Sequence, residues 1–566
     1  MSRSLCSLVR AGALAAALLT AAPAFAQVPA DDELAGWDGP SGPPPSSGVA
    51  PGADPAAEAP ARPERRRRAE IRPYLEVNLG ASAELSGGDD DVVTYGSVAA
   101  GVDGRVQTRT AVAQASYRYE RRVPIDGDDV DESVHSGVAM VHAEVAPGVS
   151  LDAGGLAAHT GGEGRAAGGT TVAGDGTQVF SAYAGPTLNY NLGPLTVGAA
   201  YRFGYVRVED DAALAGDRFD DSTVHNATAS IGMGPGSGLP FGWTVGGGYV
   251  REESGELNNV FEGQYVRGDV VLPLGPTFAL TAGVGYETYR SSSDDVLRDA
   301  GGVPILVNGR LVRDPNRPRL VGMDQDGVIY DGGFIWRPTP RTELQGRAGR
   351  RYGGTTVTGS LRHQFRRGWG VSADVYDSVG TSSTQIVSNV SQLPREFNVN
   401  RNPLTGAFDG CVFGREPGTG ICFDQALASL SNSGFRARGG NLLFSGGGRV
   451  WDVSLGGGYA HRRYTDLSSG SLATIGRYSD DSLVVNAGLS RRLGRSAGMS
   501  IDAYGSWYDS DRPLFEPIYN SGLTGSFFQS FLMDRLSLQA ALGLYRTDAL
   551  EDSTILSGLA GLRYSF

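Results

Sequence analysis

Arginine and carboxylate side chains gather between residues 331 and 374, at spacings that could serve the selection of ions or polar solutes. Arg347 and Arg362 are expected to lie close together on neighbouring strands joined by the turn Tyr352-Gly353-Gly354. Like charges on adjacent strands destabilise a sheet unless carboxylates or passing anions offset them. Such side chains are the means by which a water-filled pore selects charged solutes. The candidates for a pore lining are Arg337, Glu343, Arg347, Arg351, Arg362, Asp331, Asp374 and Glu287.

Two interpretations of these charges stay open. In the first, they form a basic rim that selects what passes through a channel. In the second, they belong to a solvated polar wall whose opposite charges cancel.

Catalytic chemistry has little support in the sequence. The six histidines are scattered over the chain, and none stands at the spacing of a metal site or a catalytic triad. We therefore predict no catalytic residue, no metal site, no cofactor and no enzyme activity.

The cysteines predict one disulfide bond, provided that the chain works outside the cytosol. Cys6 lies in the basic region ahead of an apolar run, which leaves Cys411 and Cys422 for the mature chain. Two cysteines in an oxidising compartment are expected to form one disulfide bond.

Strands must position these residues, because one alternating pattern runs from about Ile71 to the end of the chain. Residues 195–204, 278–287 and 451–460 each place apolar side chains at every second position, with small or polar ones between. Alternation over about 10 to 14 residues is what a tilted strand across a bilayer requires. We predict an all-β fold, a single closed antiparallel transmembrane β-barrel of about 22 strands, within a range of about 20 to 24.

Connection lengths support the barrel independently. Every second connection is tight, whereas the intervening ones are mostly longer and acidic, which is typical of short periplasmic turns and long outer loops. The tight connections are predicted at Asp103-Gly104-Arg105, Ala146-Pro147-Gly148, Leu192-Gly193-Pro194, Leu274-Gly275-Pro276, Pro338-Thr339-Pro340, Arg366-Arg367-Gly368, Leu493-Gly494-Arg495 and Met533-Asp534.

Backbone hydrogen bonding requires this sheet to close. An unpaired amide or carbonyl in hydrocarbon costs several kcal/mol, so Ile71 to Ser82 is predicted to pair with Thr554 to Phe566. An arginine facing lipid near the bilayer midplane costs about 2 to 4 kcal/mol, which assigns the charged face of each strand to the lumen.

The last strand carries a resemblance to a known class. Leu562, Tyr564 and Phe566 share an apolar face, and the chain stops on the aromatic residue. This end resembles the C-terminal signal of Gram-negative outer-membrane β-barrels. The resemblance implies a place in the cell outer membrane, contact with outer-membrane lipid and lipopolysaccharide, and recognition of Phe566 by the barrel assembly machinery.

The N-terminal region agrees with that location. Residues 1–26 contain Arg3, Arg10, an apolar run and the cleavage motif Ala24-Phe25-Ala26, which predicts a signal peptide. Residues 27–70 are rich in Pro and Ala and are predicted to be a disordered periplasmic tail with no room for a globular plug, ahead of a barrel at 71–566. Loss of the two leader arginines changes the net charge from −13 to −15, which argues against nucleic acid as a partner.

Two long insertions could fill the wide lumen that a barrel of this size encloses. Ser291 to Gln325 and Thr381 to Gly434 exceed the usual loop length, and we predict that one or both fold over or into the pore. A bond between Cys411 and Cys422 would hold the second insertion in shape. Extracellular decoration of an adhesive kind is the alternative.

The size, the start of the barrel and the entry Arg72-Pro73-Tyr74 are similar to the β-barrel porin type 2 group. From the barrel as a whole we predict a monomeric outer-membrane channel for passive passage of hydrophilic solutes. Export of surface polysaccharide is the nearest alternative, and a non-conducting adhesin or scaffold barrel is the second. The strand number exceeds that of general porins, roughly sixteen or eighteen, which argues against trimeric porin behaviour.

Overall fold

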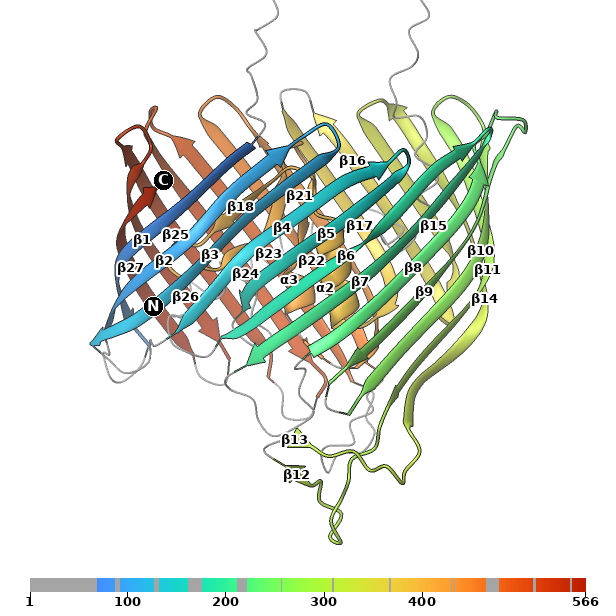
Figure 1. Cartoon of the computed structure of the whole chain (residues 1–566), viewed down its shortest axis with the longest axis horizontal. Coiled ribbons are helices and arrows are strands. Elements are labelled where there is room, and N and C mark those ends of the chain that lie inside the picture. The colour runs from blue at the N-terminus through green and yellow to red at the C-terminus, as the bar shows by residue number, and fades with distance from the viewer. Residues whose placement is uncertain are drawn as a thin grey trace, which may run out of the picture.

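The computed structural model forms one large barrel (Figure 1). It describes residues 69–86, 92–126, 132–160, 176–210, 221–255, 257–307, 310–365, 368–428, 430–431, 433–464, 478–512, 516–549 and 552–566. The predicted signal peptide and nearly all of the predicted periplasmic tail lie outside these residues.

Twenty-two antiparallel strands form the barrel sheet, which confirms the predicted fold class and strand number. Its first half comprises β1 (Ala69–Glu84), β2 (Val92–Gln107), β3 (Ala111–Asp126), β4 (Ser133–Ala146), β5 (Val149–Thr160), β6 (Thr177–Leu192), β7 (Leu195–Asp210), β8 (Asp221–Met233), β9 (Gly242–Ser254), β10 (Asn259–Pro273) and β11 (Phe278–Ser293). Its second half comprises β14 (Leu320–Thr339), β15 (Thr342–Arg351), β16 (Gly354–Phe365), β17 (Trp369–Gly380), β21 (Phe435–Gly447), β22 (Trp451–Tyr464), β23 (Ser479–Arg492), β24 (Ala497–Ser510), β25 (Ile518–Phe531), β26 (Leu536–Asp548) and β27 (Ser553–Ser565).

The sheet closes because its first and last strands pair. The ladder between β1 and β27 runs from Tyr74 opposite Ser565 to Glu84 opposite Ile555. This seam removes the open edge that hydrocarbon would penalise. The predicted pairing of the two chain ends is therefore confirmed.

The two faces of each strand meet different surroundings. On β1, the outward side chains of Leu75, Val77 and Leu79 are exposed, whereas the inward side chains of Glu76 and Asn78 are buried. An apolar outer surface and a polar inner one match a lipid environment around a wet lumen.

Short connections gather at the end of the barrel where β1 starts and β27 stops, which we call the periplasmic end. One predicted turn is wrong: β2 continues through Asp103, Gly104 and Arg105 to Gln107, because Gly104 and Arg105 still pair with β1. The chain turns at residues 108–110 instead. The predicted turn residues Arg366 and Arg367 lie outside the described residues.

The insertion after β11 stays outside the lumen. It extends past the opposite, outer end of the barrel and carries the small hairpin of β12 (Leu306–Val307) and β13 (Arg310–Leu311) (Figure 1). Arg319 Nη1 donates to Asp294 Oδ1 at 2.7 Å and ties the base of this insertion together.

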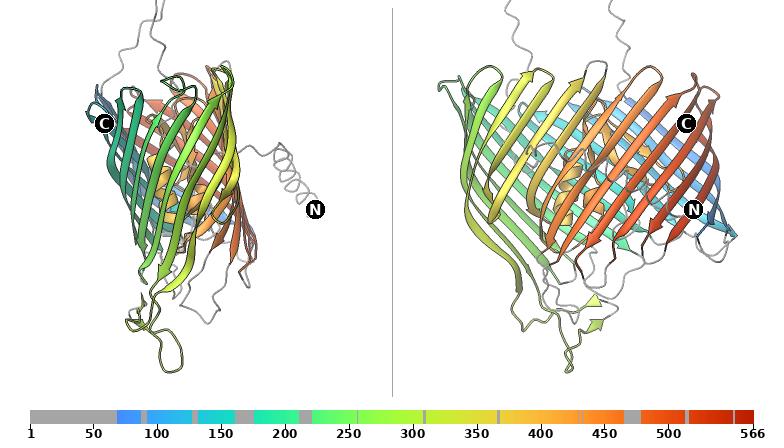
Figure 2. Two further views of the ribbon diagram at one scale, coloured as in Figure 1. Left: turned by 90° about the vertical axis from the view of Figure 1, so that its right-hand side faces the viewer. Right: turned by 180° about the vertical axis from the view of Figure 1, so that it is seen from behind.

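The insertion between β17 and β21 lies inside the barrel, as Figures 1 and 2 show. We call its described residues, from Thr381 to Gly434, the luminal plug. It contains α2 (Ser382–Ser391), a small sheet of β18 (Phe397–Arg401), β19 (Phe408–Gly414) and β20 (Gly420–Cys422), and the short helix α3 (Asp424–Leu427). A disulfide joins Cys411 on β19 to Cys422 on β20. Among the described residues, no helix is long and apolar enough to cross a membrane.

Candidate functional site

Helix α2 begins where β17 reaches the outer end of the barrel. Thr381 caps the helix by accepting a hydrogen bond from the Thr384 backbone amide, and the Thr384 hydroxyl accepts from the Thr381 amide in return. This capping box satisfies two amides that a helix start leaves unpaired. Ile386, Val387 and Val390 then share the buried face of the helix.

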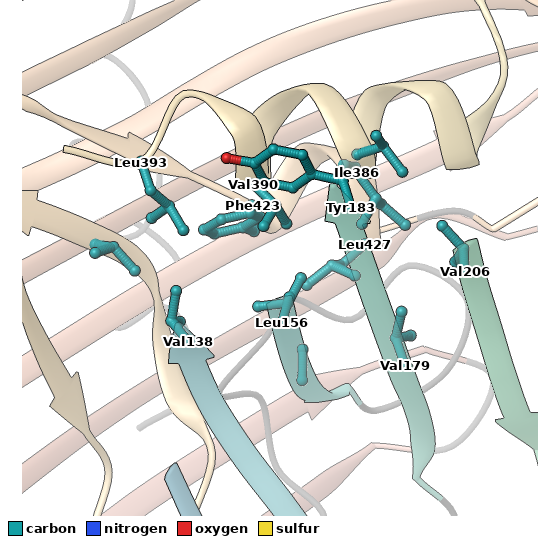
Figure 3. Close-up of a cluster of buried hydrophobic side chains, with 14 of the residues drawn as sticks. Val138, Leu156, Val179, Tyr183, Val206, Ile386, Val390, Leu393, Phe423 and Leu427 are labelled. Carbon is teal, nitrogen blue, oxygen red and sulfur yellow. The ribbon is translucent and has the colours of Figure 1, made fainter. Parts of the chain in front are cut away.

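That buried face packs against the inner wall of the barrel (Figure 3). Side chains of five consecutive strands, β4 to β8, form one apolar cluster with the plug, where a water-filled lumen would show polar groups. The wall residues in the cluster are Val138, Met140, Leu156, Ala158, Val179, Tyr183, Val206 and Val224. The plug residues are Ile386, Val387, Val390, Leu393, Phe397, Phe408, Val412, Phe423, Ala426 and Leu427.

Glycines on the wall make room for this close approach. A Cβ atom on Gly204 of β7 would lie 2.7 Å from Val387 Cγ2, which real Cβ atoms do not tolerate. A Cβ on Gly456 of β22 would lie 2.7 Å from Cys411 Sγ. Since these clashes occur on opposite sides of the plug, the wall is shaped to hold it.

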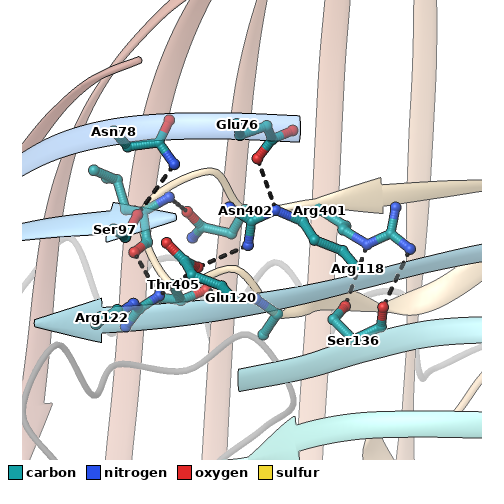
Figure 4. A network of polar contacts seen from close by, with 12 residues as sticks. Glu76, Asn78, Ser97, Arg118, Glu120, Arg122, Ser136, Arg401, Asn402 and Thr405 are labelled. Atoms are coloured by element: carbon teal, nitrogen blue, oxygen red, sulfur yellow. Dashed lines mark hydrogen bonds and ion pairs between the residues drawn. The ribbon is translucent and has the colours of Figure 1, made fainter. Parts of the chain in front are cut away.

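Hydrogen bonds hold the plug to the remaining wall. Asn402 Nδ2 donates to Tyr545 Oη at 2.9 Å, and Tyr376 Oη donates to Gln425 Oε1 at 2.8 Å. Arg401 Nη1 donates to Ser116 Oγ at 2.9 Å, beside a buried network in which Arg118 binds Glu76 and Glu120 (Figure 4). The plug therefore contacts the barrel on several sides of the lumen.

One acid of the plug is buried against the wall. Asn486 Nδ2 of β23 donates to Asp424 Oδ2 at 2.7 Å, and Asp424 lies beside the disulfide. Burial raises the pKa of Asp424 to about 7. Its charge state is therefore sensitive to pH near neutrality.

The predicted pore-lining charges are mostly neutralised on the wall. Arg347 Nη1 contacts Asp269 at 2.7 Å and Asp331 at 3.0 Å, and Arg267 contacts the same two acids. Four of the other candidates form two separate pairs, Arg351 with Glu287 at 3.0 Å and Arg337 with Glu343 at 2.9 Å. Asp374 and Arg362 instead line a cavity beside the plug.

The expected closeness of Arg347 and Arg362 is wrong. The turn at residues 352–353 places Arg351 opposite Gly354, so the register puts Arg347 opposite Thr358 and Arg362 opposite Glu343. The like charges are thereby separated along the strands.

Sequence reasoning missed several buried ionic residues. Arg267 and Asp269 on β10, and Arg118, Glu120 and Arg122 on β3, alternate in charge at every second position of a strand. Spacing of two places such residues on one face, so this pattern could have indicated a luminal ladder. Arg401 on the plug carries no such signal.

Cavities remain on either side of the plug. One of them, which we call the lateral chamber, has a volume of about 1060 Å³ and lies between the plug and β16, β17 and β21. Its wall residues include Arg362, Ser372, Asp374, Tyr376 and Asn441, and its plug residues include Asn389, Arg395, Glu396, Arg415, Glu416 and Gln425. A second cavity of about 640 Å³ lies near the periplasmic end, beside β1 and β18.

No protein family model matches the chain, and no curated protein matches it. Solved structures match in fold. The alcaligin outer-membrane receptor FauA of Bordetella pertussis is 13% identical, with 87% of this chain and 76% of that chain covered and a TM-score of 0.38. The siderophore receptor PiuA of Acinetobacter baumannii is 8% identical, with 87% and 82% covered and a TM-score of 0.43. The ferric-catecholate import receptor Fiu of E. coli K12 is 10% identical, with 87% and 81% covered and a TM-score of 0.43.

The protein is an outer-membrane β-barrel. Its fold resembles that of outer-membrane receptors, and none of the named structures is an enzyme. The resemblance to the porin type 2 group is not supported by any matching family model.

The predicted function is wrong. The lumen differs from that of an open channel, because the luminal plug packs against the wall from β4 to β8. The solved structures named above are siderophore or import receptors, and their likeness to this chain is one of fold alone.

Proposed function

We propose that this protein is a gated outer-membrane receptor, closed at rest, which imports its ligand when the luminal plug shifts. The observation that carries the proposal is the apolar cluster shared by α2 and strands β4 to β8. Burying apolar side chains of this size contributes about 1.5 to 3 kcal/mol each, so the docked plug is the stable resting state.

The attachment of the plug favours import. β17 ends at Gly380 and β21 begins at Phe435, both at the outer end, so both tethers lie where an external ligand arrives. A ligand shifts a conformational equilibrium by the difference between its affinities for the two states. Binding at this end can therefore bias the plug directly.

The two sides of the plug are held differently. Against β4 to β8 the contact is mainly apolar, with Arg401 bonded to Ser136 of β4, whereas Tyr545, Asn486 and Tyr376 hold the plug through hydrogen bonds alone. Water can replace hydrogen bonds at a net cost of about 0.5 to 1.5 kcal/mol each, so the polar side is expected to release first.

Further elements of the proposal come from the sequence. We propose transport rather than catalysis, a monomer, contact with lipopolysaccharide, and assembly through Phe566. Membership of the porin type 2 group stays a prediction, supported by Arg72-Pro73-Tyr74 at the start of β1.

Conductance in a planar bilayer tests the gate. We expect the mature protein to be closed and a variant lacking residues 382–433 to conduct as an open barrel. The double variant Gly204→Cys/Val387→Cys should form a disulfide that holds the plug in its docked position. The two Cβ positions lie 3.3 Å apart, near the Cβ–Cβ distance of roughly 3.5 to 4.5 Å in disulfides. Urea should open the parent reversibly but not the oxidised double variant, with each single cysteine variant as control.

A mature parent that conducts as freely as the deletion variant would refute the gate. Import is measured separately, as accumulation of iron-labelled catecholate in cells with and without the protein, since the comparison includes a ferric-catecholate import receptor. Equal accumulation in the two cells would exclude that ligand class.

A further inference from the structure

We infer that the lateral chamber binds an anionic ligand through Arg362 of β16 and Arg395 of the plug. This inference rests on the proposed function and gives it a ligand class, an organic acid or a phosphate compound. The two residues come from the two parts that must separate for the gate to open, one from the wall and one from the plug.

Three other luminal arginines already have carboxylate partners. Arg267 and Arg347 share Asp269 and Asp331, and Arg351 is paired with Glu287. These groups complete their charge-assisted hydrogen bonds within the wall, so they offer little to a solute.

Arg362 and Arg395 differ from those residues. Both are exposed and line the chamber, and no carboxylate of the described residues comes within 4.0 Å of either guanidinium. Glu343, opposite Arg362 in the ladder, is paired with Arg337 instead. The nearby Asp374 accepts a hydrogen bond from Asn441 Nδ2 at 2.7 Å.

The acids of the plug leave the two arginines available. Glu396 binds both Arg105 and Arg415, so one carboxylate serves two guanidinium groups. Glu416 is the other plug acid on the chamber, and its side chain is exposed. A guanidinium presents its donors in a planar fork that fits a carboxylate or a phosphate.

The size and remaining lining of the chamber define the ligand further. Its volume of about 1060 Å³ is just above the range of ligand sites, which measure roughly 300 to 1,000 Å³. Ser388, Asn389 and Gln392 of the plug, which carry hydroxyl and carboxamide groups, also line it. A polar anion with several hydrogen-bonding groups therefore fits better than an apolar one.

Calorimetric titration of the purified mature protein tests the inference. The probes are citrate, inorganic phosphate and, as a neutral polar control, raffinose. We expect an anion to bind, and Arg362→Gln and Arg395→Gln each to weaken binding roughly tenfold or more, as for loss of a charge-assisted hydrogen bond. Arg495→Gln, in an exposed periplasmic turn, should leave the affinity unchanged.

Preference for citrate would assign carboxylate chemistry, and preference for phosphate would assign phosphate chemistry; either supports the site. The inference is overturned if neither anion binds the parent, if raffinose binds as tightly, or if the two glutamine variants bind like the parent. If the parent does not conduct in the bilayer and the titration gives one of these results, the proposed gate is retained and only the anion site is rejected.

Discussion

Phe423 offers the sharpest test of how the plug is held. Its side chain is 0% exposed, lies in the apolar cluster, and meets Phe408 edge to face with ring centroids 5.9 Å apart. Replacing a buried phenylalanine by alanine costs about 3 to 5 kcal/mol, because both the transfer energy and the packing around the cavity are lost. At roughly 1.4 kcal/mol per factor of ten, Phe423→Ala should shift the docking equilibrium by about a hundredfold to several thousandfold.

The assay is the open probability of single molecules in a planar bilayer. Phe203→Ala on β7 is the matched control, because it removes the same atoms from a side chain that is 41% exposed on the outer face. We expect frequent openings for Phe423→Ala and a closed barrel for Phe203→Ala. The reasoning fails if Phe423→Ala assembles normally and stays as closed as the parent, or if the control opens equally often.

Three further predictions concern the acid, the disulfide and the lipid face. Burial raises the pKa of Asp424 from 3.8 to about 7, so undocking releases a proton and docking weakens as pH rises between these values. Asp424→Asn should abolish that pH dependence of the open probability, and an unchanged profile would contradict the assignment. Removing the Cys411–Cys422 bond, which closes a short loop, should cost the plug about 3 kcal/mol and raise its amide hydrogen exchange, whereas unaltered exchange would show that the bond is dispensable. Val284→Arg, at a site 60% exposed on the outer face of β11, should destabilise the folded barrel by about 2 to 4 kcal/mol in lipid, measured by equilibrium unfolding; no loss would place this site outside the hydrocarbon.

The barrel could be predicted from the sequence because lipid and water impose one rule on every strand. A period of two and the need for a closed sheet fix the fold class, and the count of alternating segments gives the strand number. The turn after β2 could not be placed in this way. Gly104 is a residue that favours turns, yet the hydrogen-bonded ladder between β1 and β2 continues past it.

The position of the plug was only partly predictable. Its length and two cysteines marked it as a structured insertion, but nothing in residues 381–434 says whether it enters the lumen. The missing signal lay on the wall, where Val138, Leu156, Val179 and Val206 are apolar on the inward face. Apolar side chains on both faces of a barrel strand indicate that protein, rather than water, covers the inner one.

The luminal charges were also only partly predictable from the sequence. Their residue types and strands were foreseeable, whereas their partners depend on strand register and on residues from distant strands. Arg347 meets Asp269 across a sequence separation of 78 residues and across two intervening strands, β11 and β14.

The plug is joined to the wall at both of its ends, and this has a consequence for biogenesis. A terminal plug can be threaded into a finished barrel, but an internal one is enclosed as the last strands add beyond it. Its core can settle against β4 to β8 before β27 reaches β1, because these strands and the plug all precede the last strands in the chain. Once the barrel is closed, the two covalent connections allow the luminal plug to move aside but keep it attached to the wall.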